Sequence, residues 1–371
     1  MKKLGFGCMR LPLTQPQDAA SVDLEQCRQM VDLFLARGFT YFDTAYFYHN
    51  RQSECFVRQM LVERHPRSAF VLADKMPLGI LGEKTAEDQD RIFHEQLEKC
   101  GVDYFDYYLL HCIDEENYAI AQRLDTFSYL AQKKAEGKIR RLGFSFHDSA
   151  AFLDQVLTAH PEMDFVQLQI NYLDWEDPLI QSRLCYETAR RHQKPVVVME
   201  PVKGGQLANL SQPVAELLHA HAPGASPASW AIRFAAGLDG VMMVLSGMSS
   251  LEQVADNTQF MDAFTPLTPE ERTITVQAAQ MLRQEGAIPC TACSYCTAGC
   301  PQAIPIPALF TLYNNQVRAP RPDRRETYQA LTQSQHAASA CISCGQCAAA
   351  CPQHLDIPTL LHQQVAPAFE R

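Results

Sequence analysis

Four titratable side chains in the first third of the chain could together protonate a carbonyl oxygen. They are Asp43 and Tyr48 in FDTAYFYHN, Lys75 in VLADKMP and His111 in YYLLHC. A tyrosine hydroxyl ordinarily titrates near pH ~10, which is too high for easy proton exchange at neutrality. We expect the Lys75 ammonium to lower that pKa, Asp43 to position Lys75, and a neutral His111 to hydrogen-bond the same carbonyl. Each residue alone has an ordinary structural explanation, but the four together predict proton donation while another group delivers hydride.

Two runs of cysteines near the end of the chain indicate metal chemistry. CTACSYCTAGCP begins at residue 290, and CISCGQCAAACP repeats its spacing from residue 341. The pattern C-x2-C-x2-C-x3-C-P resembles the bacterial ferredoxin motif, in which the fourth cysteine of each run ligates the other cluster. It predicts two [4Fe-4S] clusters, one held by Cys290, Cys293, Cys296 and Cys351 and the other by Cys341, Cys344, Cys347 and Cys300. Structural zinc and disulfides are the alternatives, but zinc sites use pairs of C-x2-C.

The elements that must position these residues alternate along the chain. Eight short apolar or β-branched runs, from KLGFGCM to GVMMVLSG, are mostly followed by stretches with helical spacing, such as VDLEQCRQMVDLFLARG. Short buried strands alternating with helices indicate parallel βα units. Eight of them within about 285 residues predict a closed (β/α)8 barrel, whose active site lies at the carboxyl ends of the strands. The alternative is an open doubly wound sheet. Its mark would be a Gly-rich GxGxxG turn after the first strand, and LGFGCM does not have that pattern.

Composition divides the chain into two predicted domains, a barrel over 1–285 and a small ferredoxin-like module over 286–371. The module has little core for its size and reads as helical around Ala308–Asn315 and Pro358–Val365, so a metal centre is expected to hold it together. The formal net charge is −10. This charge argues against nucleic acid as a partner. No signal peptide or membrane span is expected, which predicts a cytoplasmic protein.

The predicted barrel resembles the aldo–keto reductases over about residues 1–285. FDTAYFYHNRQSE is similar to that family's Asp-Thr-Ala-x-x-Tyr signature. The resemblance implies that Tyr48 is the general acid/base, that Asp43 and Lys75 tune it, and that His111 orients the substrate carbonyl. Tyr46 stands at the wrong spacing to be the donor. The whole chain resembles the subset of these reductases that carry a ferredoxin-like tail. The tail itself resembles the α-helical ferredoxin domains found in iron–sulfur subunits of larger oxidoreductases.

The resemblance also implies a site for NADP or NAD. Ser145 in GFSFHD and Gln169 in QLQINY match residues that hold the nicotinamide carboxamide, although Phe146 replaces the family's Asn. Met199 stands where the family usually stacks an aromatic ring on the nicotinamide. The segment LSGMSSLEQVADN matches the phosphate-binding loop, with Gly247 and Gln253 in place of the Lys and Arg that recognise a 2′-phosphate. Its other expected cofactor contacts are Ser249, Ser250 and Asn257.

Two functions remain open from the sequence. The first is an NAD(P)H-dependent oxidoreductase that reduces a small-molecule carbonyl to an alcohol, or the reverse. Its difficulty is that hydride carries two electrons whereas a cluster takes one, and no flavin motif is visible. The clusters could be structural, sense redox state or serve a redox partner protein. The second function is an electron-transfer or nucleotide-sensing subunit without carbonyl turnover, against which the intact set of four titratable residues argues.

Overall fold

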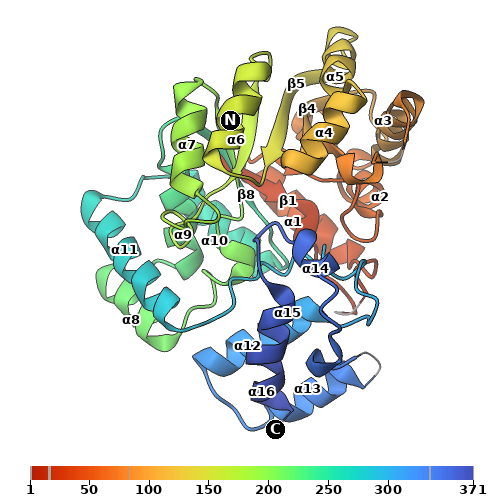
Figure 1. The fold of residues 1–371 in the computed structure, drawn as a ribbon. Helices are drawn as coiled ribbons and strands as arrows, with labels where there is room; N and C mark the ends of the chain where they lie inside the picture. The colour runs from red at the N-terminus through yellow and green to blue at the C-terminus, as the bar shows by residue number, and fades with distance from the viewer. Residues whose placement is uncertain (1, 16–17, 83, 334–335, 371) are drawn as a thin grey trace. The chain divides into compact units, whose positions relative to one another are not determined.

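Eight parallel strands close into a barrel in the computed structural model, which describes residues 2–15, 18–82, 84–333 and 336–370. The strands pair in chain order and β1 also pairs with β8, which closes the ring (Figure 1). The (β/α)8 prediction is therefore confirmed, and the open sheet is excluded. The strands are β1 (Leu4–Gly7), β2 (Tyr41–Asp43), β3 (Val71–Met76), β4 (Phe105–Ile113), β5 (Ile139–Phe146), β6 (Phe165–Gln169), β7 (Val196–Met199) and β8 (Val241–Ser246).

Side chains from most of the strands fill the inside of the ring. The buried cluster there consists of Tyr41, Ala73, Leu109, Phe165, Val197, Met243 and Leu245. Glycine is required where these large side chains leave no room. A Cβ on Gly143 would lie 2.5 Å from the Phe165 carbonyl oxygen, so β5 can approach β6 only with glycine there. The interior is a packed core, which leaves the strand ends to carry chemistry.

Amphipathic helices cover the outside of the strands. In α1 (Leu24–Ala36) the predicted stripe is largely buried at Cys27, Val31 and Phe34, and the Asp23 side chain caps its first turn. Phe34 packs at ring-centroid distances of 5.5 Å from Phe6 and 5.4 Å from Phe42, which fixes α1 to β1 and β2. The other helices that follow strands in the same way are α2 (Ser53–Val57), α3 (Ala86–Cys100), α4 (Glu115–Arg123), α5 (Thr126–Ala135), α6 (Ala150–Ala159), α7 (Ser182–Arg191), α9 (Pro227–Ala236) and α10 (Leu251–Asp262).

The chain divides into two compact units. The first comprises Met1–Ile170, Gln181–Pro201 and Ile232–Pro266, and the second comprises Asn171–Ile180, Val202–Ala231 and Leu267–Arg371. The second unit thus includes the segments that follow β6 and β7 as well as the cysteine runs. The domain boundary after residue 285 remains a prediction.

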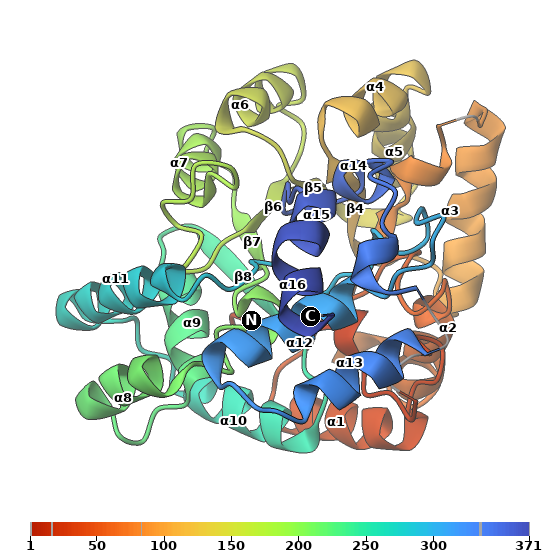
Figure 2. The same ribbon diagram turned by 60° about the horizontal axis from the view of Figure 1, so that its bottom comes forward.

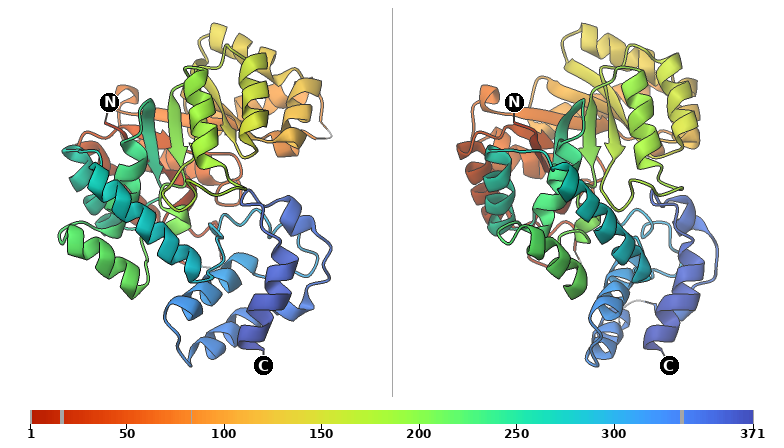
Figure 3. Two further views of the ribbon diagram at one scale, coloured as in Figure 1. Left: turned by 60° about the vertical axis from the view of Figure 1, so that its left-hand side comes forward. Right: turned by 90° about the vertical axis from the view of Figure 1, so that its left-hand side faces the viewer.

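The second unit is helical, as its composition predicts. It contains α8 (Gln212–His221), α11 (Pro269–Gln284), α12 (Ile306–Arg318), α13 (Arg324–Thr332), α14 (Gln346–Ala349), α15 (Ile357–Leu360) and α16 (Ala366–Phe369). Figure 2 shows α12 beside α13, and both views of Figure 3 show α8 beside α11. The two predicted helical stretches lie at α12 and at the run from α15 to α16.

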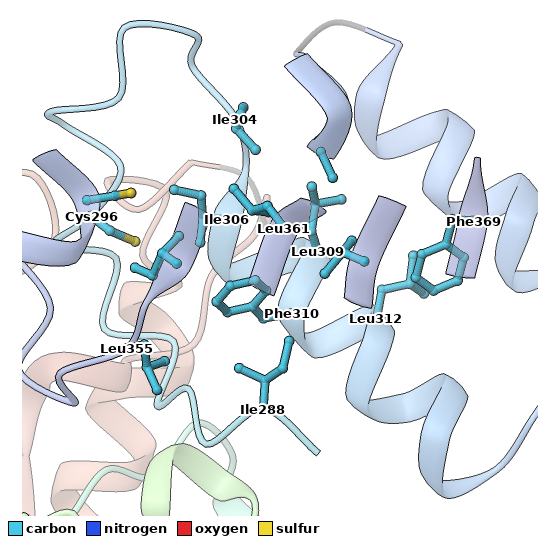
Figure 4. Packing of buried hydrophobic residues seen from close by; sticks show 14 of the residues in the cluster. Ile288, Cys296, Ile304, Ile306, Leu309, Phe310, Leu312, Leu355, Leu361 and Phe369 are labelled. Carbon is cyan, nitrogen blue, oxygen red and sulfur yellow. The ribbon is translucent and has the colours of Figure 1, made fainter. Parts of the chain in front are cut away.

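A small apolar core lies in the cysteine-containing part of this unit, between Ile288 and Phe369. Leu309 and Phe310 of α12 pack with Leu361 and with Ile288, which comes just before the first cysteine run (Figure 4). Cys296 and Cys347 belong to the same buried cluster. The core therefore reaches into the cysteine loops. Across the described ranges, no helix is long and apolar enough to cross a membrane.

Candidate active site and candidate metal centre

The predicted catalytic and nicotinamide-binding residues lie at or just beyond the carboxyl ends of successive strands. Asp43 ends β2, Gln169 ends β6 and Met199 ends β7, while Lys75 and Ser145 are each next to last in their strands. Because all eight strands run parallel, these ends meet at one rim of the barrel. The fold therefore brings the predicted residues together.

Lys75 and Asp43 form a buried ion pair. The Lys75 Nζ lies 2.6 Å from the Asp43 Oδ1 and donates a second hydrogen bond of 2.7 Å to the Thr44 carbonyl. Both side chains are almost fully buried, at 1% and 3% exposure. Burial raises the pKa of Asp43, and the adjacent ammonium opposes that shift. The second carboxylate oxygen of Asp43 is buried without a hydrogen-bond partner in the described chain, which leaves an acceptor for a ligand.

Tyr48 lies against this pair through its ring. The Lys75 Nζ is 5.1 Å from the Tyr48 ring centroid, a cation–π distance. The pKa of Tyr48 is raised well above its usual value, first by burial and then by the negative charges of Asp43, Glu200 and Cys8, while Arg10 opposes the shift. The expectation that Lys75 lowers this pKa is therefore wrong for the chain without ligands. Burial is the largest cause of the shift, and the positive charge that opposes it is that of Arg10, whereas the Lys75 ammonium faces the ring and pairs with Asp43.

An irregularity in β4 aims His111 at the same place. The pairing of β4 with β5 shifts register between Leu110 and Ile113, and Cys112 has a left-handed φ of 61°. Such bulges redirect a side chain at a barrel rim. The His111 ring lies 6.2 Å from the Tyr48 ring, edge to face. Burial and the charge of Lys75 lower the pKa of His111 well below its usual value, so the imidazole is neutral, and its Nδ1 is buried without a partner in the described chain.

The predicted carboxamide contacts lie on the next strands. Ser145 is buried, and its Oγ accepts a 2.7 Å hydrogen bond from the Cys112 amide. The bulge thus occupies one lone pair of this hydroxyl and leaves its proton to be donated. Gln169 is buried at the end of β6, and Met199 is half-buried at the end of β7. Their roles toward a nicotinamide stay predictions.

The predicted phosphate loop leads into α10. Ser250 caps this helix, because its Oγ accepts from the Gln253 amide at 3.3 Å. The Gln253 side chain in turn accepts from the Ser249 amide at 2.7 Å. Asn257 is buried and donates to the Ser246 hydroxyl at 2.9 Å. The loop therefore has a preorganised helix N-terminus of the kind that binds phosphate groups. Asn257 ties α10 to the last residue of β8 through its hydrogen bond to Ser246.

Sequence reasoning missed Arg10, which follows β1 at the same rim. Its side chain packs on Gly247, where an added Cβ would lie 3.0 Å from the Arg10 Cδ. Its carbonyl accepts from the Ser249 hydroxyl at 2.7 Å, and its guanidinium lies 3.6 Å from the Glu200 carboxylate. Arg10 thus brings a cation to the loop that has Gly247 in place of the family's lysine. Applying the strand-end rule to β1 would have found it.

Cysteines of both runs lie close together in the second unit, and their division into two crossed sets stays a prediction. Burial raises the pKa of the Cys296 thiol, and so do the nearby thiols of Cys293, Cys290 and Cys351 from the first predicted set and of Cys347 from the second. The pKa of Cys347 is likewise raised by burial and by the nearby Cys341 and Cys300 thiols. Thiols so close that their charges oppose each other are suited to bind a cationic centre.

The four cysteines of the second predicted set line one cavity. Cys300, Cys341, Cys344 and Cys347 share its wall with apolar side chains that include Ile304, Ile306, Ile342 and Leu361. Four thiols around an apolar hollow fit an iron–sulfur cluster by donor chemistry and by surroundings. Cys344 is the exposed member of the set, so this cavity opens toward solvent.

Comparison with known families gives two matches along the chain. A model of the aldo/keto reductase family matches residues 3–279. A model of a 4Fe-4S dicluster domain matches residues 275–356. The second match contains all eight cysteines of the two runs.

The curated relatives are distant. L-galactose dehydrogenase of Arabidopsis thaliana is 25% identical over 254 residues, covering 64% of this chain and 78% of its own. An aldo-keto reductase of Mycolicibacterium vanbaalenii is 28% identical over 238 residues, with 64% and 78% covered. Across such relatives the chain spans from 64% to 80% of their lengths.

Solved structures agree with the barrel. The holo form of an aldo-keto reductase from Bacillus halodurans has a TM-score of 0.57 at 26% identity, covering 74% of this chain and 91% of its own. An aldo/keto reductase from Klebsiella pneumoniae, in complex with NADP and acetate, has a TM-score of 0.58 at 23% identity, with 75% and 90% covered. This second likeness is one of fold alone.

Proposed function

Because the chain belongs to the aldo/keto reductase family and carries a 4Fe-4S dicluster domain, we propose that it is an NAD(P)H-dependent oxidoreductase that interconverts a small-molecule carbonyl and its alcohol. The observation that carries the proposal is the buried Lys75–Asp43 pair, 2.6 Å apart, with its ammonium 5.1 Å from the Tyr48 ring. His111 completes the group. A bound nicotinamide supplies the hydride in this chemistry.

Tyr48 supplies the proton. Its raised pKa keeps the hydroxyl protonated at neutral pH, so the donor is loaded before reaction. Hydride transfer to a carbonyl carbon produces an alkoxide, which is a stronger base than a phenolate and takes the Tyr48 proton. The neutral His111 donates a hydrogen bond to the same oxygen and orients it. Water then returns a proton to the phenolate, whose charge the nearby Arg10 guanidinium favours.

Ser145, Gln169 and Met199 are proposed to hold the nicotinamide, and the Gly247–Asn257 segment to hold its phosphates. In its hydrogen bond with the Cys112 amide, the Ser145 hydroxyl is the acceptor. Its own proton can therefore be donated to a carboxamide oxygen. Arg10 adds a positive charge beside Gly247. The choice between NADP and NAD stays open, and Arg10 is proposed to supply a cation in place of the Lys and Arg of other family members.

Two [4Fe-4S] clusters complete the proposal, one in each crossed set of four cysteines. The first set is supported by the nearness of Cys293, Cys290 and Cys351 to Cys296, although Cys347 is also near, and the shared cavity supports the second set. Such clusters exchange single electrons when bound. Their role in turnover is left to experiment.

The test uses purified, cluster-loaded protein and a panel of carbonyl compounds with NADPH and NADH. We expect carbonyl-dependent oxidation of the nucleotide, lowered about 10²- to 10⁴-fold in Tyr48→Phe. Tyr46→Phe is the matched control, because the Tyr46 hydroxyl is 3.4 Å from Glu95 and stands at the wrong spacing. If no carbonyl supports oxidation while a partner protein reduces the clusters, the chain is an electron-transfer subunit and the proposal fails.

A further inference from the structure

One lysine of the second unit lies fully buried outside the catalytic group. Lys203 follows β7 and is the last lysine in the sequence. Its Nζ donates to the Asp174 Oδ1 at 2.6 Å and to the Gln353 Oε1 at 2.9 Å. The Lys203 and Asp174 side chains are 1% and 3% exposed. Burying an ion pair costs desolvation of both ions, so its retention calls for a reason beyond stability.

Each partner of Lys203 has a fixed place. The second Asp174 oxygen accepts from the Asn171 side chain at 2.7 Å, and the Asp174 amide donates to Asn171 Oδ1 at 2.8 Å. Gln353 is buried two residues after Cys351. The ammonium is therefore held between a rigid turn after β6 and the chain segment that carries Cys351.

The same short segment also holds the first cysteine run. Gln206 donates to the Cys290 carbonyl at 2.8 Å and is oriented by Arg318, which donates to its Oε1 at 3.1 Å. Between them, Gly204 lies so close to the backbone that an added Cβ would be 2.4 Å from the Thr291 carbonyl oxygen. Residues 203–206 thus fix the segments of both Cys290 and Cys351, which belong to one predicted cluster set.

The second cysteine set has different surroundings. Its cavity walls are mostly apolar, and Cys344 is exposed. Net charge, hydrogen bonding and solvent exposure set the reduction potential of an iron–sulfur cluster. A buried ammonium stabilises the electron added on reduction, and a buried carboxylate opposes it, because charges interact strongly where water is excluded.

We propose that Lys203, balanced by Asp174, is a positioning residue that sets the reduction potential of the cluster held by Cys290, Cys293, Cys296 and Cys351 and separates it from that of the second cluster. The inference rests on the two clusters of the proposed function. Removing the charge of Lys203 or of Asp174 therefore leaves the other charge without its counter-ion. Lys203→Met lowers the potential of one cluster. Asp174→Asn raises it, because the amide carries no negative charge; its oxygen can still accept from Lys203, while its nitrogen then faces the Asn171 amide.

Redox titration of the cluster-loaded full chain, followed by electron paramagnetic resonance, tests this inference. We expect one of the two reduction waves to move by at least tenfold in its equilibrium constant, about 59 mV for one electron, in opposite directions in the two variants. The other wave stays in place. Lys194→Met is the matched control, because Lys194 donates to the carbonyls of Pro161 and Met163 in the barrel unit.

The outcomes separate the inference from its premise. Wild-type protein whose iron content corresponds to fewer than two clusters contradicts the two-cluster proposal itself, whereas two clusters that titrate as one wave contradict the proposed separation of their potentials. Two waves that stay unmoved in both variants, or that move in the same direction, overturn the role of Lys203. If Lys203→Met cannot hold iron, the shift in Asp174→Asn decides alone, and its absence overturns the inference.

Discussion

At the scale of single residues, burial dominates the proton chemistry of the candidate site. The pKa of Tyr48 is raised and that of His111 is lowered, and desolvation is the first cause of both shifts. Each shift favours the neutral form that proton donation to a carbonyl requires. The site therefore keeps a phenol and an imidazole uncharged side by side, although a buried ion pair lies next to them.

This leads to a prediction for pH dependence. A raised pKa keeps Tyr48 protonated as pH increases to its ordinary value near ~10, and a lowered pKa keeps His111 neutral as pH decreases through its ordinary value near ~6.5. We expect kcat/KM for carbonyl reduction to be flat from about pH 6.5 to 9. Initial rates across this range provide the measurement, with cluster absorbance recorded at each pH. An inflection inside the window with intact clusters would contradict the assignment.

Arg10 carries a second prediction at this scale. Its aliphatic stem packs against Gly247 at the proposed phosphate loop, and its guanidinium lies 3.6 Å from Glu200. We expect Arg10→Met to raise KM for the nicotinamide nucleotide about tenfold, equivalent to 1.4 kcal/mol, with a smaller change in kcat. Steady-state kinetics with varied nucleotide measures the effect. Arg141→Met is the control, since Arg141 is 63% exposed near the start of β5, and an equal change there would remove the argument for Arg10.

At the scale of elements, the turn after β7 depends on one glycine. Gly204 has a φ of +62° and no room for a Cβ beside Thr291. Left-handed strain and overpacking together predict that Gly204→Ala lowers the free energy of unfolding of the second unit by about 2–4 kcal/mol and lowers iron content. Gly224→Ala is the control, because nothing lies within 4 Å of its added Cβ. Denaturant unfolding and iron analysis compare the two, and equal stability would show that the turn adapts.

The elements also show how far the sequence could predict the structure. Alternating apolar runs located all eight strands because buried parallel strands have a distinct length and composition. Placing polar residues at strand ends then located Asp43, Lys75 and Ser145. The bulge that aims His111 was not predictable, because it depends on a register shift between β4 and β5. The pKa of Tyr48 was predicted in the wrong direction, since sequence shows neighbouring charges but not desolvation.

At the scale of the whole molecule, the polypeptide connects the proposed nicotinamide site directly to the unit that contains the cysteines. Segments 171–180 and 202–231 follow β6 and β7 directly, and they belong to the compact unit that contains the cysteines. The first of these segments begins two residues after Gln169, and the second begins three residues after Met199. We therefore expect that loosening of the cysteine unit also loosens the turns after β6 and β7, next to the residues proposed to hold the nicotinamide.

Removing iron tests this expectation on the full chain. The second unit has a small core that extends to Cys296 and Cys347, so loss of its clusters should loosen the unit as a whole. We expect hydrogen exchange to increase after chelation not only in the cysteine runs but also in segments 171–180 and 202–211, while β1 to β5 keep their protection. Mass spectrometry of the iron-loaded and iron-depleted protein makes the comparison. Loss of protection confined to residues 286–371 would instead favour the domain boundary predicted from composition, and would show that the turns after β6 and β7 are held by the barrel.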